Sequence, residues 1–149
     1  CLYEMGQKVL FSGDTLIKHI TPNPLMVIKR NKLLDPGYKS LKAYSMSLDR
    51  LAGLDIKYVF TGHGEYIRDL PGLISTYKRH QRERMELVWK ALHNRKRTLY
   101  EIIGDVIHEV PDGDVFLAIS EIFVHLEILL EDERAELVDP GPPALYRSW

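Results

Sequence analysis

Two stretches decide the fold: Val9-Leu10-Phe11-Ser12-Gly13-Asp14 and Tyr58-Val59-Phe60-Thr61-Gly62-His63-Gly64. Each begins as a short apolar run typical of a buried β-strand and ends in a glycine turn that carries a polar side chain. Glycine leaves room for a sharp turn and for close approach of the backbone, so a side chain beside it can face a cleft. Asp14 and His63 are therefore the candidate functional residues.

The chemistry of these two residues allows two interpretations. A carboxylate oxygen and an imidazole nitrogen are both good ligands for Zn²⁺, and a carboxylate can bridge two ions. Alternatively, Asp14 caps a turn and His63 is an ordinary loop histidine. Two ligands so far apart in the sequence make no metal-binding signature, so spacing alone favours the second interpretation.

Around these stretches the sequence predicts further strands and helices. Residues 1–5 and 8–11 alternate as two strands joined by a tight turn at Gly6-Gln7. Residues 18–37 contain several prolines without periodicity, which predicts mostly loop. Residues 38–54 and 69–93 show apolar positions at helical spacing and predict two amphipathic helices.

A change of composition at residues 94–97 predicts a linker into a second module. Thr98 and Glu101 form a capping-box pattern that opens a helix to about residue 109. Asp114 is predicted to cap a helix over 115–130, and residues 135–138 and 144–149 predict a terminal hairpin. Helix, helix and hairpin in residues 95–149 form the outline of a small winged-helix-like module.

The bulk composition is that of a soluble globular protein, with 45% hydrophobic and 28% charged residues. The single cysteine, Cys1, excludes an internal disulfide and fits a reducing, cytoplasmic compartment. No apolar run is long enough to predict a membrane span. Because the sequence opens in a strand pattern, with neither a start methionine nor a signal-peptide layout, we expect a piece of a longer protein.

Charge is distributed unevenly along the chain, although the net charge is only −1. Residues 71–100 carry 8 basic and 2 acidic side chains, whereas residues 101–149 carry 2 basic and 12 acidic ones. Acidic side chains on the 115–130 helix would repel phosphates, so nucleic-acid binding is not expected of this tail. We expect the basic run Arg95-Lys96-Arg97 to engage the acidic tail of the same or another chain.

The two deciding stretches, taken in order with the helix between them, resemble the second half of the metallo-β-lactamase superfamily. The resemblance rests on Phe11-Ser12-Gly13-Asp14-Thr15-Leu16, Tyr44, Ser47-Leu48 and Phe60-Thr61-Gly62-His63-Gly64. It implies that Asp14 is the metal-bridging carboxylate and that His63 is the last histidine ligand. With this resemblance, metal binding by Asp14 and His63 becomes the favoured interpretation, ahead of a turn cap and an ordinary loop histidine.

The resemblance extends into the rest of the chain. Tyr77, His80 and Arg84 are similar to the helix pattern of a subgroup related to glyoxalase II, in which a winged-helix-like tail follows. The implied fold is α/β: part of an αββα sandwich over residues 1–94, then a winged-helix-like module over 95–149. The implied activity is hydrolysis of an ester, thioester or phosphodiester assisted by two divalent ions, expected to be zinc.

One departure from the family bears directly on activity. The family's His-x-His-x-Asp-His motif is absent, and none of the histidines, at positions 19, 63, 80, 93, 108 and 125, shows that spacing. A catalytic zinc normally takes three protein ligands and water. We therefore predict that this chain alone binds metal weakly and is inactive. The alternative is a non-catalytic module for dimerisation or partner docking.

The remaining polar residues are predicted to have structural or peripheral roles. Lys18 and His19 are expected on the solvent or substrate side of the cleft, whereas His80 and Arg84 are expected to pack the helix against the hydrolase body. We expect His125 to be packed on its apolar helix. The residues predicted to lie at turns and helix ends are Asp35, Asp49, Asp55 and Asp69.

An incomplete sandwich would leave one sheet face and one edge uncovered. We therefore predict self-association, exchange of elements, or disorder near the N-terminus and over residues 18–37.

Overall fold

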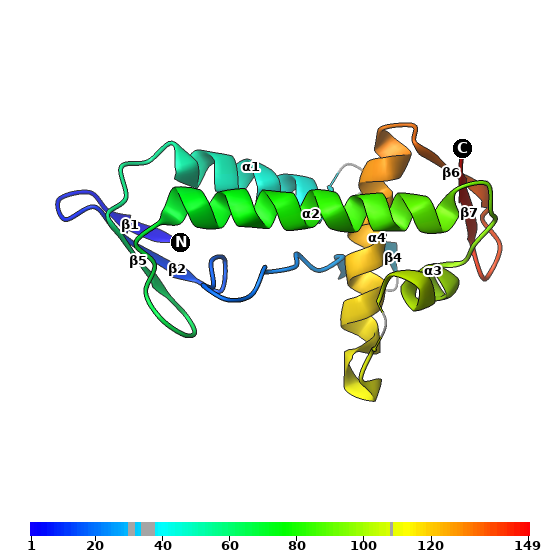
Figure 1. Ribbon diagram of the computed structural model, residues 1–149, viewed down its shortest axis with the longest axis horizontal. Coiled ribbons are helices and arrows are strands. Elements are labelled where there is room, and N and C mark those ends of the chain that lie inside the picture. Colours follow the sequence, from blue (N-terminus) through cyan, green and yellow to red (C-terminus); the bar gives the residue numbers. More distant parts are fainter. Residues whose placement is uncertain (30–31, 34–37, 108) are drawn as a thin grey trace. The chain divides into compact units, whose positions relative to one another are not determined.

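The computed structural model describes residues 1–29, 32–33, 38–107 and 109–149. They form two compact units: Cys1–Asn23 with Tyr44–His80, and Pro24–Ala43 with Gln81–Trp149. Helices α1 (Ser40–Ala52) and α2 (Leu70–Leu92) are labelled in Figure 1. By residue number, each helix contributes residues to both units. The two units therefore differ from the two segments predicted from the sequence, residues 1–94 and 95–149. That predicted division into domains stays a prediction.

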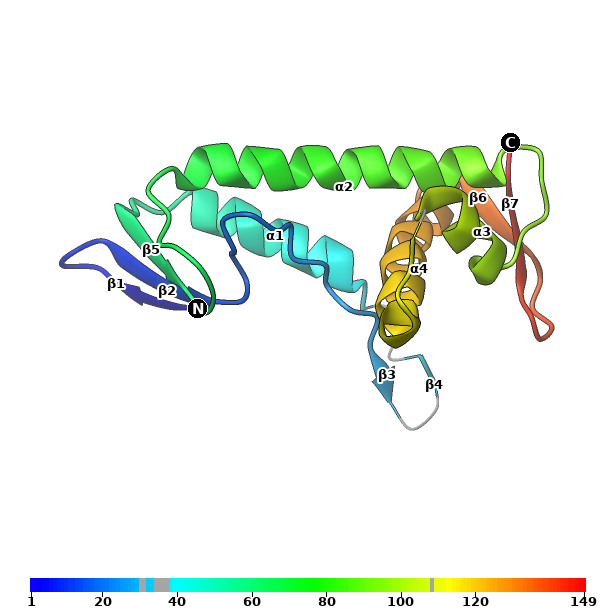
Figure 2. The same ribbon diagram turned by 60° about the horizontal axis from the view of Figure 1, so that its bottom comes forward.

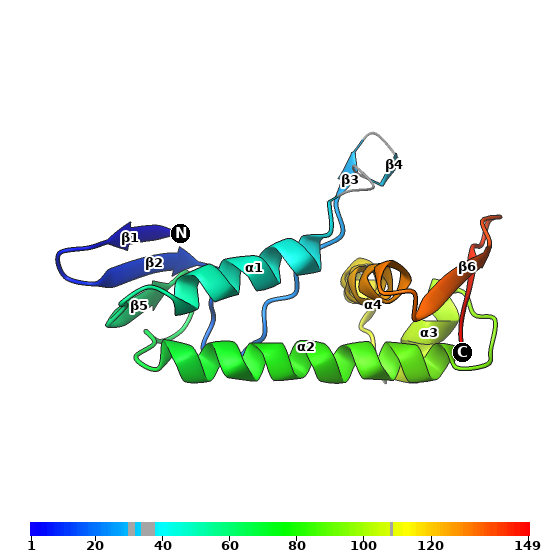
Figure 3. The same cartoon turned by 90° about the horizontal axis from the view of Figure 1, so that it is seen from above.

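The first unit is built on a three-stranded sheet in the order β1-β2-β5 (Figure 3). Strand β1 (Leu2–Glu4) pairs antiparallel with β2 (Val9–Gly13), and β2 pairs parallel with β5 (Tyr58–Thr61). In the hairpin turn, the Glu4 carboxylate accepts hydrogen bonds from the amides of Gly6 and Gln7, at 2.9 and 2.7 Å. The predicted hairpin and the predicted third strand are both confirmed.

The two faces of this sheet have different environments. Leu10 and Val59 lie side by side in the strand register and are 1% and 0% exposed. They belong to a core cluster that helices α1 and α2 complete, with Leu48, Leu51, Ile74 and Tyr77. On the other face, Leu2, Phe11 and Phe60 follow one another across the three strands and are 68%, 49% and 44% exposed.

The second unit contains a short element that the sequence does not predict. Within the stretch predicted as mostly loop, residues 18–37, β3 (Ile28–Lys29) pairs antiparallel with β4 (Lys32–Leu33). Strands of two residues are too short to show the alternation from which strands are predicted. The expectation of disorder over residues 30–31 and 34–37 and the expected turn role of Asp35 concern residues outside those that the structure describes.

The helices of the second unit begin in two different ways. Helix α3 (Leu99–Val106) opens with the predicted capping box: the Glu101 amide donates to the Thr98 hydroxyl at 3.3 Å, and the Thr98 amide donates to the Glu101 carboxylate at 2.8 Å. The prediction that Asp114 caps helix α4 (Val115–Glu131) is wrong, because its side chain makes no capping hydrogen bond. Asp114 belongs to a 3₁₀ turn, η1 (Asp112–Asp114), whose backbone leads directly into the helix.

The predicted terminal hairpin is confirmed as β6 (Ala135–Asp139) paired antiparallel with β7 (Leu145–Ser148) (Figure 2). The core of this unit joins the end of α2 to α3, α4 and the hairpin. Its fully buried members include Val88, Leu92, Ile102, Ile122, Leu126 and Leu129. No helix within the described parts of the chain combines the length and apolar character that crossing a bilayer requires.

Candidate metal centre

The pairing of two parallel strands brings the two candidate residues together. Strands β2 and β5 are neighbours and run in the same direction, so their carboxyl ends meet at one edge of the sheet. Asp14 follows the last residue of β2, and His63 lies in the turn after β5. The distance from His63 Nε2 to Asp14 Oδ1 is 3.4 Å. That Asp14 and His63 bind metal stays a prediction.

Glycines make this approach possible. The Gly62 amide donates a hydrogen bond of 2.9 Å to the Gly13 carbonyl, which ties the two strand ends together. A Cβ atom on Gly62 would lie 2.5 Å from Asp14 Oδ1, closer than real contacts allow, and 3.2 Å from the Gly13 carbonyl carbon, tighter than most real contacts. Gly13 itself has a φ of 55°, in the region that side chains disfavour.

The turn that carries His63 is closed on itself by hydrogen bonds. The amides and carbonyls of Val59 and Ile67 exchange two hydrogen bonds, each 2.9 Å long, so the chain returns to the sheet after the turn. Within the turn, the Thr61 hydroxyl donates to the His63 carbonyl at 2.7 Å. The imidazole is therefore presented from a short, internally bonded loop.

Both side chains are open to solvent, His63 at 76% and Asp14 at 65% exposure. Their donor atoms are therefore accessible to an ion. Among the residues that the structure describes, no group of three or more His, Cys, Asp or Glu side chains could hold a metal ion. The chemistry of the pair suits a divalent ion, but two donors are fewer than a catalytic zinc normally takes from a protein.

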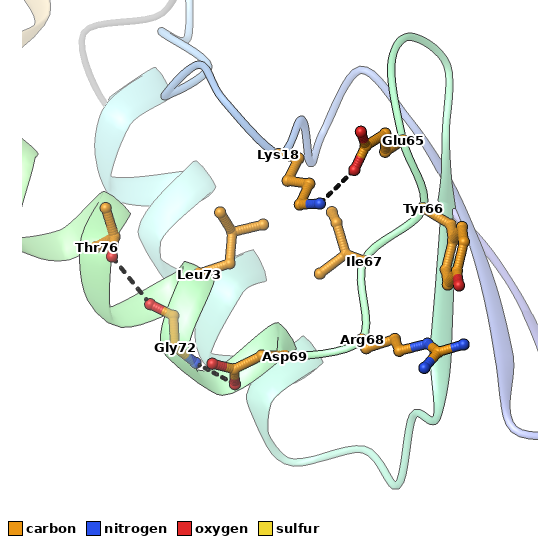
Figure 4. A pocket seen from close by; sticks show the side chains of 9 residues that line it. All are labelled: Lys18, Glu65, Tyr66, Ile67, Arg68, Asp69, Gly72, Leu73 and Thr76. Atoms are coloured by element: carbon orange, nitrogen blue, oxygen red, sulfur yellow. Dashed lines mark hydrogen bonds and ion pairs between the residues drawn. The ribbon is translucent and has the colours of Figure 1, made fainter.

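A pocket of about 740 Å³ lies beside the turn in the same unit (Figure 4). Ile67 and Leu73 form its apolar part, and Lys18, Arg68 and Asp69 contribute charged groups around them. Lys18 forms an ion pair with Glu65, and this hydrogen bond and charge lower the pKa of the Glu65 carboxyl. Lys18 thus lines this pocket, whose lining includes neither Asp14 nor His63, and its place on the substrate side stays a prediction.

The other polar residues considered in the sequence differ in exposure and in their partners. His19 and His80 are exposed, whereas His125 is 2% exposed, with its Nδ1 2.7 Å from the Glu121 carbonyl oxygen. Arg84 packs within the second unit, where Nη1 donates to the Val106 carbonyl and Nε lies 2.7 Å from a Glu121 carboxylate oxygen. The structure thus bears out a packed His125. The expectation that His80 and Arg84 pack α2 against the hydrolase body is wrong, because His80 is exposed and the bonds of Arg84 lie within the second unit.

The turn and helix-end aspartates also have structural roles. Asp69 accepts a hydrogen bond from the Gly72 amide at the start of α2. Asp49 forms an ion pair with Lys78, and Asp55 forms one with Lys8.

Three residues that support the Asp14 turn were not predicted to do so from the sequence. The buried Ser12 hydroxyl lies 3.3 Å from the Leu16 carbonyl, and the Tyr44 and Tyr77 hydroxyls hydrogen-bond to the backbone just after Asp14. In the sequence both tyrosines occupy apolar helix positions, which indicates burial but not the partner of the hydroxyl.

Comparisons with known proteins find relatives in sequence and in fold. No protein-family model matches the chain. It is 33% identical over 124 residues to a probable metallo-hydrolase, YqjP, of Bacillus subtilis (strain 168), an alignment covering 83% of this chain and 38% of that protein.

Two solved structures match 99% of the chain. A metallo-β-lactamase family protein from Thermus thermophilus has a TM-score of 0.79 with 27% identity, over 44% of its length. A β-lactamase domain protein from Burkholderia ambifaria has a TM-score of 0.85 with 21% identity, over 43% of its length. The chain therefore spans less than half the length of these proteins, and over that span it has the α/β fold of the metallo-β-lactamase superfamily.

Proposed function

We propose that this chain is part of a metal-dependent hydrolase of the metallo-β-lactamase superfamily, to which it contributes two metal ligands. The observation that carries the proposal is the 3.4 Å approach of His63 Nε2 to Asp14 Oδ1 at the carboxyl ends of neighbouring parallel strands. The printed names of the relatives, a probable metallo-hydrolase and a metallo-β-lactamase family protein, support it.

In this proposal the metal is zinc, the ion whose preferred ligands include both a histidine nitrogen and a carboxylate oxygen. A bound divalent ion would act as a Lewis acid that polarises the carbonyl or phosphoryl oxygen of an ester, thioester or phosphodiester. This chain holds the Asp14 carboxylate and the His63 imidazole at one sheet edge. In this proposal, the remaining ligands lie in another part of the whole protein, one that corresponds to the part of the relatives that this chain does not match.

We extend the proposal to the organisation of the whole protein. In this proposal, the chain is the C-terminal half of the whole protein. That protein belongs to a subgroup related to glyoxalase II and lies in the cytoplasm. The order α3, α4 and the β6-β7 hairpin supports a winged-helix-like module. This module is acidic, and two of its few basic side chains pair with its own carboxylates: Arg97 lies 3.2 Å from Asp105, and Arg147 lies 2.5 Å from Glu136, so a nucleic acid is not its proposed partner.

The first prediction concerns zinc binding by this 149-residue chain. We expect weak binding of Zn²⁺, because Asp14 and His63 alone leave an ion under-coordinated. Asp14→Asn and His63→Gln should each weaken it further, by about tenfold or more, or about 1.4 kcal/mol. Isothermal titration calorimetry measures the Zn²⁺ affinity of the wild type and its change in each variant.

A matched control is His80→Gln, which removes an exposed histidine of helix α2 and should leave the titration unchanged. Tight binding of two ions per chain would refute the predicted weak binding. Binding that is unaffected by Asp14→Asn and His63→Gln would refute the assignment of these residues as ligands.

A second candidate function, assembly through the exposed sheet face, is favoured by the aromatic side chains on that face. The rings of Phe11 and Phe60 stack with centroids 5.6 Å apart, and the Tyr66 ring centroid lies 6.2 Å from that of Phe60. A contiguous apolar patch of this kind is typical of an interaction surface.

We predict that the chain self-associates through this face and that Phe11→Thr with Phe60→Thr shifts it toward the monomer. Threonine keeps the β-propensity of these positions while it removes the apolar rings. Sedimentation velocity over a range of concentrations measures the change. Tyr100→Thr, at a residue 77% exposed on helix α3, is the control. A wild-type chain that stays monomeric at every concentration would contradict the prediction.

A further inference from the structure

The backbone that follows Asp14 is held by hydroxyl groups from two different helices. Tyr44 of α1 donates a hydrogen bond of 2.8 Å to the Thr15 carbonyl. Tyr77 of α2 bonds twice to Ile17: its hydroxyl accepts from the Ile17 amide at 2.8 Å and donates to the Ile17 carbonyl at 2.5 Å. Three hydrogen bonds thus fix residues 15–17, the segment immediately after the candidate ligand.

The same segment is also anchored from within the core. Leu16 lies between the two bonded residues and is 0% exposed, in the same apolar cluster as Tyr77. The Thr15 amide donates to the Ser12 carbonyl at 3.3 Å, which closes the turn around Asp14. Residues on both sides of Asp14 therefore have fixed positions, although the Asp14 carboxylate itself is open to solvent.

Both phenols are suited to this role at neutral pH. Burial raises the pKa of the Tyr44 hydroxyl above its ordinary value, and the proximity of Tyr77 raises it further. Burial also raises the pKa of Tyr77, against a smaller opposite effect of its hydrogen bond with Ile17. Both hydroxyls accordingly keep the proton that they donate to a backbone carbonyl.

We propose that Tyr44 and Tyr77 are positioning residues for the metal ligand Asp14: through residues 15–17 they hold its backbone where the carboxylate meets His63. The proposal rests on the proposed function, because it takes Asp14 as a ligand. It assigns to these tyrosines a role beyond filling the core. Groups that orient a ligand typically change metal affinity by about 10-fold to 100-fold when they are removed.

The test uses Tyr44→Phe and Tyr77→Phe in this 149-residue chain, because phenylalanine keeps the ring and removes only the hydroxyl. The first readout needs no metal: hydrogen exchange of the Gly62 amide, which donates to Gly13 beside Asp14. We expect exchange to accelerate by at least about threefold in both variants. The matched control is Tyr146→Phe, at a buried tyrosine of the second unit.

The second readout is a Zn²⁺ titration followed through the amide shifts of Gly13, Gly62 and Gly64. Both variants should bind Zn²⁺ more weakly than the wild type, by about 10-fold or more, with the control unchanged. A merely structural role would lower the melting temperature of all three variants without a selective change at these glycines.

The outcomes separate this inference from the proposed function. Unchanged Gly62 exchange in Tyr44→Phe and Tyr77→Phe would overturn the positioning role, whatever the titration shows. Selective acceleration of Gly62 exchange, with no response of the wild type to Zn²⁺, would support the hydroxyl anchoring of the turn and overturn the metal-ligand assignment. Selective changes in both readouts would support the full proposal.

Discussion

Alanine at position 62 is expected to separate the two candidate ligands and to weaken Zn²⁺ binding by this chain about tenfold. The added Cβ would lie 2.5 Å from Asp14 Oδ1 and 3.2 Å from the Gly13 carbonyl carbon. The exposed Asp14 side chain can rotate away from the first contact, but this movement takes its carboxylate away from His63. The contact with the Gly13 carbonyl carbon involves the backbone, which must shift.

We therefore expect two measurable effects of Gly62→Ala. The Zn²⁺ titration should weaken, and the free energy of unfolding should fall by about 1–3 kcal/mol, the usual range for a group forced into an occupied space. Chemical denaturation measures the second effect. The hydrogen bond between the Gly62 amide and the Gly13 carbonyl would lengthen, so exchange of the Gly62 amide should also accelerate.

Gly104→Ala is the matched control for Gly62→Ala. Gly104 lies within α3, and its added Cβ would meet no atom within 4 Å. Alanine there should stabilise the chain by about 0.5–1 kcal/mol, since glycine is the poorer helix residue. If Gly62→Ala behaved like Gly104→Ala, the close approach of the two strand ends would not hold in solution.

Leu126→Ala is expected to destabilise the second unit by about 2–5 kcal/mol, the cost of a large-to-small change in a packed core. Leu126 is 0% exposed and belongs to the cluster that joins α2, α3, α4 and the terminal hairpin. Removal of its side chain loses apolar burial and leaves a cavity among these elements. The change in denaturation midpoint, at an unchanged slope, measures the effect.

Helix α4 provides the control for this substitution. Leu117 occupies the same helix but is 47% exposed, so Leu117→Ala should change the free energy of unfolding by less than about 0.5 kcal/mol. Equal effects of the two substitutions would contradict the placement of α4 in the core. A loss of stability in Leu126→Ala alone would support the placement of α4 in the core.

Local elements could be predicted from the sequence where a local rule determines them. The β1-β2 hairpin, the three long helices and the Thr98 capping box follow from alternation, helical spacing and a four-residue motif. Asp114 shows the limit of such rules. Its residue type favours a helix cap, but as the last residue of the 3₁₀ turn its backbone has a φ of −107° and a ψ of 6°, outside the extended conformation typical of a cap.

The candidate site depends on contacts between distant residues, and these are harder to predict. Spacing alone favoured an ordinary turn residue and a loop histidine, and the family resemblance was needed to expect that Asp14 and His63 converge. Their 3.4 Å approach comes from the pairing of β2 with β5, which no local pattern encodes. The hydrogen bonds of Tyr44 and Tyr77 to residues 15–17 depend on helix packing for the same reason.

The parallel pairing of β2 with β5 also has a consequence for how the chain folds. The β1-β2 hairpin closes over a few residues, whereas the partners Val9 and Tyr58 meet only after the long crossover that includes α1. Closing a long loop costs more chain entropy than closing a hairpin, and topologies with such contacts fold more slowly. We therefore expect the hairpin and helices to form early, while the acidic and imidazole donors meet in one of the last steps of folding.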